Sequence, residues 1–296
     1  MNDTTPQTYL GLDGGGSGCR LAICDRSGRR LAETRGGAAN YTSDPDATVR
    51  NLRAAIAAAA QEAGLDPAGL ASCVAHLGLA GIMDAAQAAT LAAAMPCDRI
   101  TVTDDRPTTA AGALGSRDGA VAAVGTGSFV AVRRGESLRH FGGWGLRFGD
   151  QASGAWLGRS ALERCLLVWD GLSDPSQLTS EIWQRFEDTP ARMVAFGATS
   201  SPGALAEFAP LVIDAAASGD AQGRALMQAG ADYIESCLAA VELRGDEVLC
   251  LTGGIGPHFA EYLTPETRQR LCPPQGSALD GALSLARAAL DGDIAR

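Results

Sequence analysis

The sequence has 296 residues, and its 24 Lys+Arg residues against 34 Asp+Glu residues give a formal net charge of −10. All the positive residues are arginines, which excludes a Walker-A phosphate loop, the strand lysine of protein kinases and Schiff-base catalysis. The acidic balance without a basic run argues against a nucleic-acid or anionic-membrane surface, but not against a phosphate ligand, because backbone N–H groups bind phosphate without side-chain charge.

The first part of the chain predicts the element order β-β-β-α-β-α-β. Strands are expected over residues 8–13, 19–24, 30–34, 73–79 and 100–103. Helices are expected over residues 45–63 and 84–95. The first helix is well marked, because Asp44 is a candidate N-cap, Pro45 suits the first helical position and Gly64 supplies the stop.

The second part of the chain repeats this order of elements. Strands are expected over residues 120–124, 129–132, 138–141 and 247–251. A long helical region precedes the last of these strands, and a closing helix is expected over residues 279–290. Two copies of a mixed three-layer α/β unit, facing one another, would enclose a cleft between them.

Four Gly-rich turns follow apolar strands, at residues 13–17, 125–128, 142–145 and 253–256. Backbone can approach a polyphosphate closely where no Cβ intervenes, although any one of these turns is also compatible with a plain hairpin. Asp13 precedes the first turn at a strand end, which is where a carboxylate would hold a hydrated Mg²⁺.

Three further carboxylates stand at helix starts. Asp104 and Asp105 follow an apolar strand, and they are interpreted either as an N-cap pair or as the source of a general base that takes a hydroxyl proton. Asp150 precedes another helix and is either a cap or a contact for substrate hydroxyls.

The remaining chemistry-bearing residues carry no clear signal. The eight cysteines form no Cys-x-x-Cys pair and are interpreted as buried, reduced thiols of a cytoplasmic protein. His76 is interpreted as a core or edge histidine, and no His or Cys spacing resembles a zinc site. The tryptophans are most simply core residues, although Trp144 lies in a Gly-rich loop and could face a ligand. No signal peptide or membrane span is predicted.

The motifs occur in an order that resembles the BadF/BadG-type ATPase family and its N-acetylglucosamine and glucosamine kinase members, within the actin-like sugar-kinase superfamily. The resemblance covers nearly the whole chain, and residues 142–158 are its most specific part. It implies an α/β fold of two RNase H-like, actin-like ATPase domains whose interdomain cleft closes over ATP and sugar. The expected domains are residues 1–112 and 113–279, with a helix over about 280–296 packing back on the first.

The resemblance also implies roles for individual residues in ATP binding. Asp13 would anchor Mg²⁺ through water, two Gly turns would be the phosphate motifs, and a third turn would border the adenosine. The residues expected to contact ATP are Asp13, Gly14, Gly15, Gly16, Ser17, Gly125, Thr126, Gly127, Ser128, Gly253 and Gly254. Two departures are visible: Gly18 stands where the family often has a basic residue, which leaves only Arg20 for such a contact, and Gln151 replaces a frequent glutamate.

For the acceptor, the resemblance implies that Asp105 is the catalytic base and that Asn40, Asp105 and Asp150 contact the sugar. The implied function is an ATP-dependent kinase acting on the 6-hydroxyl of N-acetylglucosamine or glucosamine, and the sequence does not separate these two sugars. A homodimer in the cytoplasm is expected. The alternative is an ATPase that activates a 2-hydroxyacyl-CoA dehydratase through a shared iron–sulfur cluster; a non-catalytic actin-like protein is a third interpretation.

Overall fold

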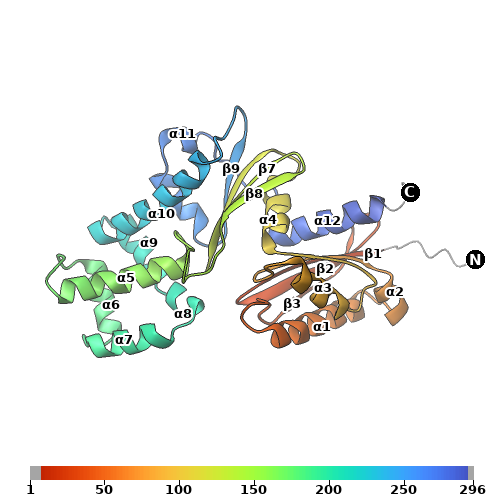
Figure 1. Cartoon of the computed structure of the whole chain (residues 1–296), viewed down its shortest axis with the longest axis horizontal. Helices are drawn as coiled ribbons and strands as arrows, with labels where there is room; N and C mark the ends of the chain where they lie inside the picture. The colour runs from red at the N-terminus through yellow and green to blue at the C-terminus, as the bar shows by residue number, and fades with distance from the viewer. Residues whose placement is uncertain (1–7, 293–296) are drawn as a thin grey trace, which may run out of the picture. The chain divides into compact units, whose positions relative to one another are not determined.

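The computed structural model describes residues 8–292, and the chain divides into two compact units (Figure 1). Unit 1 consists of residues 1–117 and 274–296, and unit 2 of residues 118–273. The expected boundaries, after residues 112 and 279, lie a few residues away. Among the described residues, no helix combines the length and the apolar character that crossing a bilayer requires.

Unit 1 contains a five-stranded mixed sheet in the order β3-β2-β1-β4-β5. Its strands are β1 (Thr8–Gly15), β2 (Gly18–Asp25), β3 (Arg30–Gly36), β4 (Val74–Leu79) and β5 (Arg99–Thr103). Short turns make β1, β2 and β3 antiparallel, whereas β4 and β5 run parallel to β1 after helical crossovers. The predicted element order of this part is therefore confirmed.

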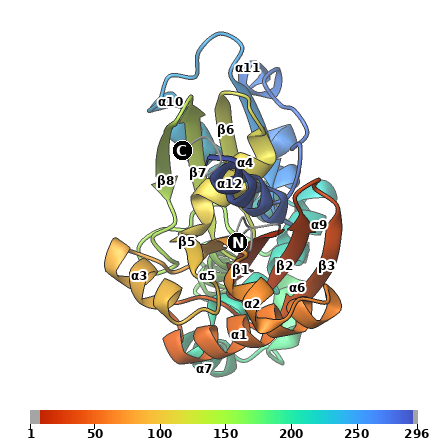
Figure 2. The same ribbon diagram turned by 90° about the vertical axis from the view of Figure 1, so that its right-hand side faces the viewer.

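Helices cover both faces of this sheet (Figure 2). They are α1 (Pro45–Glu62), α2 (Pro67–Ala71), α3 (Ala85–Ala93), α4 (Asp105–Leu114) and α12 (Ala278–Gly292). Because side chains alternate along a strand, Leu10 and Leu12 of β1 join the core under α1, while Tyr9 packs with Leu283 of α12. The predicted start of α1 is confirmed, since the Asp44 side chain accepts a hydrogen bond from the Ala47 N–H at 2.8 Å.

The helix α12 lies so close to β1 and α4 that glycine is required at the contacts. A Cβ at Gly11 of β1 would stand 2.5 Å from the backbone nitrogen of Leu283. A Cβ at Gly281 would stand 1.9 Å from the carbonyl oxygen of Thr108 in α4. The last described helix of the chain therefore completes the core of the first unit.

Unit 2 contains a four-stranded sheet in the order β8-β7-β6-β9. Its strands are β6 (Gly119–Val124), β7 (Ser128–Arg134), β8 (Ser137–Gly142) and β9 (Val248–Thr252). As in unit 1, the first strand pairs antiparallel with the second and parallel with the strand that follows the helices. The repeat predicted from the order of elements is thus present in the strand pairing.

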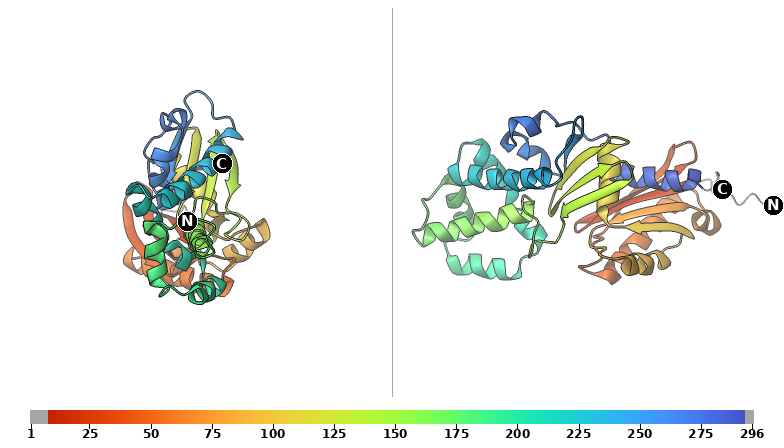
Figure 3. Two further views of the ribbon diagram at one scale, coloured as in Figure 1. Left: turned by 90° about the vertical axis from the view of Figure 1, so that its left-hand side faces the viewer. Right: turned by 45° about the horizontal axis from the view of Figure 1, so that its top comes forward.

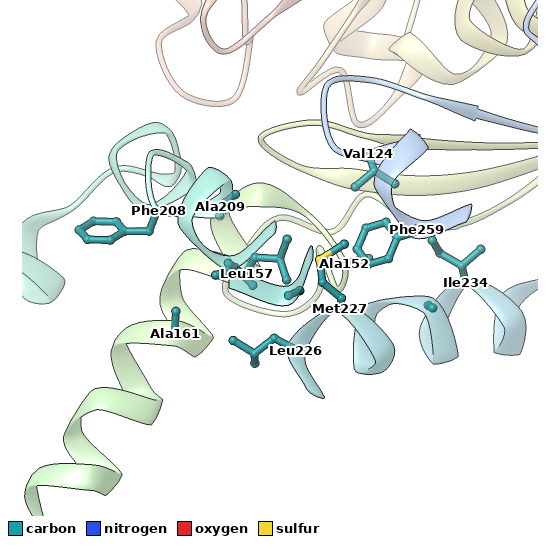
Figure 4. Packing of buried hydrophobic residues seen from close by; sticks show 14 of the residues in the cluster. Val124, Ala152, Leu157, Ala161, Phe208, Ala209, Leu226, Met227, Ile234 and Phe259 are labelled. Carbon is teal, nitrogen blue, oxygen red and sulfur yellow. The ribbon is translucent and has the colours of Figure 1, made fainter. Parts of the chain in front are cut away.

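The helices of unit 2 form one core with a face of this sheet (Figure 3). They are α5 (Gly154–Trp169), α6 (Gln177–Arg185), α7 (Pro190–Thr199), α8 (Pro202–Ala206), α9 (Ala209–Ala217), α10 (Ala221–Ala239), a 3-10 segment (Gly256–Tyr262) and α11 (Pro265–Arg268). Figure 4 shows Phe259 beside Ala152 and Ile234 in this core. The prediction that the tryptophans are core residues is wrong for Trp169, whose exposed fraction is 58%. Trp144 is 57% exposed, so of its two alternatives the core position is wrong and the position facing out of the Gly-rich loop remains.

Candidate functional site

The predicted residues of unit 1 gather at one edge of its sheet. In the parallel register, Asp13 of β1 lies opposite Gly78 of β4, and Gly78 lies opposite Thr103 of β5. Asp104 and Asp105 follow Thr103 directly, so they share this edge with Asp13, about 10 Å away at two strand spacings. Parallel strands end on the same side of a sheet, and this topology is what brings the carboxylates together.

Asn40 is fixed to the same edge by the loop that follows β3. Its side-chain oxygen accepts a hydrogen bond from the Ser43 N–H at 3.1 Å, and the N–H of the next residue, Tyr41, donates to the Ala80 carbonyl at 3.0 Å. Gly81 has a φ of +83°, and a Cβ there would stand 2.4 Å from the Asn40 side-chain oxygen. Asn40 is half-buried and thus held at the end of β4.

The neighbouring carboxylates Asp104 and Asp105 have different surroundings. Asp104 is the N-cap of α4, and its carboxylate accepts from the Arg106 backbone N–H at 2.9 Å and from the guanidinium Nε and Nη2 at 2.6 and 3.0 Å. The capping interpretation is therefore correct for Asp104. Asp105 is the first residue of the helix, and because Asp104 takes the cap, its carboxylate is left for other chemistry.

Asp105 has the electrostatic surroundings of a proton acceptor. Burial, together with the negative charges of Asp104 and Asp13, raises the pKa of Asp105 to about 6, and Arg106 offsets only part of this effect. A general base is most effective when its pKa lies near the working pH. The site thus supplies a carboxylate that is ionised at neutral pH and still basic enough to accept a proton.

The side chain of Asp13 is paired with Arg20. The two residues face each other across the β1–β2 hairpin, and Arg20 Nη2 donates to Asp13 Oδ2 at 3.0 Å. The Asp13 side chain is 21% exposed and that of Arg20 46%. An arginine therefore stands beside the first Gly turn, two residues along β2 from the departure at Gly18.

The glycines of the first turn differ in what requires them. At Gly14, a Cβ would stand 2.4 Å from Leu79 Cδ2 and 3.0 Å from Ala39 Cβ, so a side chain there would require the packing to shift. At Gly15 and Gly16, a Cβ would meet nothing within 4 Å, and the backbone is not in the left-handed region. Neither packing nor conformation explains these two glycines, whereas close approach of a ligand to the backbone does.

The Gly turn at residues 125–128 of unit 2 packs against the start of α5. Gly154 and Ala155, at the N-terminus of this helix, donate their N–H groups to the carbonyls of Gly125 and Thr126 at 2.8 and 3.2 Å. Gly125 resembles Gly15 in that a Cβ would meet nothing within 4 Å. The first free amides of α5 thus fix the turn, so the helix N-terminus itself does not act as the phosphate site.

Asp150 joins this turn to the loop that follows β8. Its carboxylate accepts hydrogen bonds from the N–H groups of Ser128 and Gly145, and burial raises its pKa. Asp150 is only 7% exposed and adopts a φ of +58°, which is unusual for a non-glycine residue. A carboxylate has about four acceptor positions, so two remain for other donors.

The Gly turn at residues 253–256 lies beside the one at residues 125–128. Thr252 at the end of β9 is in register with Ala123 of β6, and the Ile255 N–H donates to the Val124 carbonyl at 3.0 Å. Gly253 has a φ of +80°, and a Cβ there would stand 2.2 Å from the Val124 oxygen. A Cβ at Gly254 would meet nothing within 4 Å, so Gly254 resembles Gly15 and Gly16, whereas Gly253 does not.

The donor set at Asp13 fits magnesium better than a closed metal site. Among the described residues, no group of three or more His, Cys, Asp or Glu side chains converges on one point. Mg²⁺ binds through one or two carboxylates, several waters and substrate phosphates, so the single carboxylate of Asp13 is compatible with it. His76 is confirmed as a structural histidine, since it contacts Thr103 Oγ1 at 3.2 Å and burial lowers its pKa to about 4.

Two features of unit 2 were not expected from the sequence. Cys250 and Cys272, 22 positions apart, have their Sγ atoms 3.5 Å from each other. A cavity of about 750 Å³, lined by residues such as Trp144, Phe148 and Leu166, lies against α5, and none of the residues predicted to contact ATP or the sugar lines it. Neither feature has a local signal in the sequence, because both depend on segments that meet only in the folded chain.

The chain is similar to several known proteins over nearly its whole length. The model of the BadF/BadG/BcrA/BcrD ATPase family matches residues 10–269. Glucosamine kinase GspK of Vibrio cholerae is 32% identical over 279 residues, which cover 94% of this chain and 95% of that protein. A Chromobacterium violaceum structure, provisionally assigned as an N-acetylglucosamine kinase, is 32% identical with a TM-score of 0.87, covering 95% of this chain and 99% of that one.

A more distant structure shows how far the fold extends. A ROK family glucokinase from Streptomyces griseus, solved with glucose and AMPPNP, has a TM-score of 0.60 at 19% identity, covering 95% of this chain and 99% of that one. At this identity the likeness concerns the fold alone. The expected mixed α/β fold of the actin-like kinase type is therefore confirmed.

Proposed function

The chain belongs to the BadF/BadG/BcrA/BcrD ATPase family, and from this premise we propose that it is an ATP-dependent amino-sugar kinase. The proposed reaction transfers the γ-phosphoryl group of ATP to the 6-hydroxyl of glucosamine or N-acetylglucosamine. The observation that carries this proposal is the surroundings of Asp105, whose neighbour Asp104 is occupied by Arg106 and whose pKa is raised to about 6. Both relatives with 32% identity bear the name of an amino-sugar kinase.

In the proposed mechanism, Asp105 accepts the proton of the attacking hydroxyl. Phosphoryl transfer needs accurate positioning of the nucleophile and little covalent chemistry from the protein. Asn40 and Asp150 would orient the sugar, since the amide oxygen of Asn40 is fixed by its loop and Asp150 has two acceptor positions left. These contacts would hold the hydroxyl toward the phosphorus atom and away from competing water.

The triphosphate would lie against the Gly turns. Gly15, Gly16, Gly125 and Gly254 leave open space where a Cβ would otherwise stand, so backbone N–H groups and the hydroxyls of nearby residues can approach the phosphates. The residues around them that would contribute are Gly14, Ser17, Thr126, Gly127, Ser128 and Gly253. Asp13 would hold Mg²⁺ through water, and the bound ion would neutralise phosphate charge. When ATP binds, the Arg20 guanidinium would give up its hydrogen bond to Asp13 and donate to a phosphate oxygen instead.

The alternative, an activator of a 2-hydroxyacyl-CoA dehydratase, needs cysteines that hold an iron–sulfur cluster between subunits. The structure does bring Cys250 and Cys272 together, but Cys250 is fully buried. A cluster shared at a subunit surface requires exposed thiolates, which does not suit this pair. A brown, iron-containing purified protein would favour the alternative.

We propose that the kinase works in the cytoplasm, because ATP, its nucleotide substrate, is made there. We also propose that it forms a homodimer, which light scattering would test.

The decisive experiment is an ADP-release assay with a panel of amino sugars and hexoses. We expect glucosamine or N-acetylglucosamine to stimulate ADP release well above the rate with water alone. The variant Asp105→Asn should lose about 10²- to 10⁴-fold in kcat, because it keeps the shape of the side chain and removes the base. Full activity of this variant would refute the assignment of the base, and a panel without any stimulating sugar would refute the kinase itself.

A further inference from the structure

Cys250 and Cys272 lie side by side at the point where unit 2 ends. Leu249 of β9 and Leu271 form a parallel bridge, in which the Leu249 N–H donates to Arg270 at 2.8 Å and the Cys272 N–H donates to Leu249 at 3.0 Å. The next residue on each segment is a cysteine. Neighbouring strands are about 4.8 Å apart, which lies within the Cα separation of about 4.4–6.8 Å that a disulfide spans.

The two thiols already contact each other. Their Sγ atoms are 3.5 Å apart, so a disulfide of about 2.05 Å requires a movement of about 1.5 Å, within reach of side-chain rotation. Cys272 is half-buried and Cys250 is fully buried. An oxidant can therefore reach one thiol of the pair, and the other stands behind it.

We propose that Cys250 and Cys272 are a site of reversible oxidation to a disulfide, with a peroxide as the oxidant. The Cys272 thiolate attacks one peroxide oxygen, the O–O bond breaks, and a sulfenic acid and hydroxide form; the hydroxide takes up the proton that the Cys272 thiol released and becomes the first water. The sulfur of Cys250 then attacks the sulfenic sulfur, the S–O bond breaks, and hydroxide leaves with the Cys250 proton as a second water. A dithiol reductant returns two electrons and restores both thiols.

The location of the pair connects oxidation to the proposed function. Pro273 is the last residue of unit 2 and Pro274 the first of the returning segment of unit 1, so Cys272 directly precedes the crossover. The Cys250 thiol donates to the Pro273 carbonyl at 3.9 Å, and β9 leads to Gly253 and Gly254. A disulfide would tie the crossover to β9, and on the premise of the proposed kinase we expect turnover to slow.

Because the sequence contains no lysine, trypsin cleaves it only after arginine, and the expected peptides are few and easily assigned. Cleavage after arginine places Cys250 in the peptide 245–268 and Cys272 in the peptide 271–287, each with a single cysteine. The full-length protein is treated with hydrogen peroxide, blocked with N-ethylmaleimide, digested with trypsin and analysed by mass spectrometry. We expect these two peptides linked, two hydrogen masses below their sum, and separated again by dithiothreitol.

Matched variants complete the test. Cys272→Ser and Cys250→Ser should lose the linked peptide, whereas Cys237→Ser, which removes another buried thiol of unit 2, should keep it. Oxidation of Cys272 to sulfinic acid without a linked peptide, or linkage to another cysteine, would overturn the proposal. In the ADP-release assay, peroxide should lower the turnover of the wild-type protein reversibly and leave the turnover of Cys272→Ser unchanged. If the disulfide forms and turnover stays the same, the proposal that the disulfide slows turnover is refuted. Failure of the kinase assignment can be told apart from failure of the disulfide proposal. If only the kinase assignment is wrong, the reduced protein shows no sugar-dependent turnover but the linked peptide still forms.

Discussion

At the scale of single residues, the surroundings that make Asp105 a base also destabilise the fold. A carboxyl whose pKa is raised in the folded state opposes folding while it is ionised. This cost is fully present above about pH 6 and declines as the pH falls through the folded pKa of Asp105. A loss of stability of this kind is tolerated at functional sites, where activity rather than stability is selected.

The pH dependence of turnover follows from the same pKa. We expect kcat/KM for the sugar to fall about tenfold per pH unit below about pH 6, because protonated Asp105 accepts no proton. The measurement is a pH series of the ADP-release assay. ATP binding measured over the same series is the control, and a kcat/KM that stays constant through pH 6 would contradict the prediction.

The ion pair of Arg20 predicts a second effect at this scale. Arg20→Ala removes a charge-assisted contact worth about 1.5–3 kcal/mol, so the KM for ATP should rise roughly 10- to 100-fold with a smaller change in kcat. Arg35→Ala is the matched control, because Arg35 lies opposite Arg20 on β3, one strand farther from Asp13. Equal effects of the two substitutions would show that only general charge is involved.

At the scale of elements, the glycines of β1 and of the turn that follows it serve two different roles. Gly16→Ala in the turn after β1 should leave the melting temperature unchanged and weaken ATP binding, since a Cβ there meets open space. Gly11→Ala in β1 should instead destabilise the fold by about 1–3 kcal/mol, because its Cβ collides with the backbone of α12. Thermal melts and nucleotide titrations of both variants check this; a destabilised Gly16→Ala protein would contradict it.

Local signals account for most of the elements themselves. Asp44 and Pro45 marked the start of α1, and apolar runs marked the strands, because caps and periodicity act over a few residues. The residues themselves left the roles of Asp104 and Asp105 open, and only the resemblance assigned the base to Asp105, since no local pattern shows which carboxylate Arg106 will bind. The exposure of Trp169 was not predicted, because hydrophobicity alone does not tell a core residue from an exposed one.

At the scale of the whole molecule, unit 1 is discontinuous and unit 2 is continuous. Residues 118–273 contain their own sheet and core, whereas the sheet of unit 1 needs α12 to cover Tyr9, Cys24 and Val74. We expect a fragment of residues 118–273 to melt cooperatively and a fragment of residues 1–117 to aggregate. Circular dichroism of the two fragments tests this, with peptide 274–296 added to rescue the second; a stable, monomeric 1–117 fragment would refute it.

The sequence by itself determined the order of elements, the N-cap of the first helix, the position of every Gly turn and the resemblance to a kinase family, because these depend on residues close together in the chain. The absence of lysine belongs to this group, and it already directed attention to backbone amides as phosphate ligands. Only the tertiary structure decided which carboxylate stays available at the start of α4, which glycines face open space, and that Cys250 touches Cys272. Those facts depend on contacts between distant segments, and such contacts are set by packing and strand register rather than by local pattern.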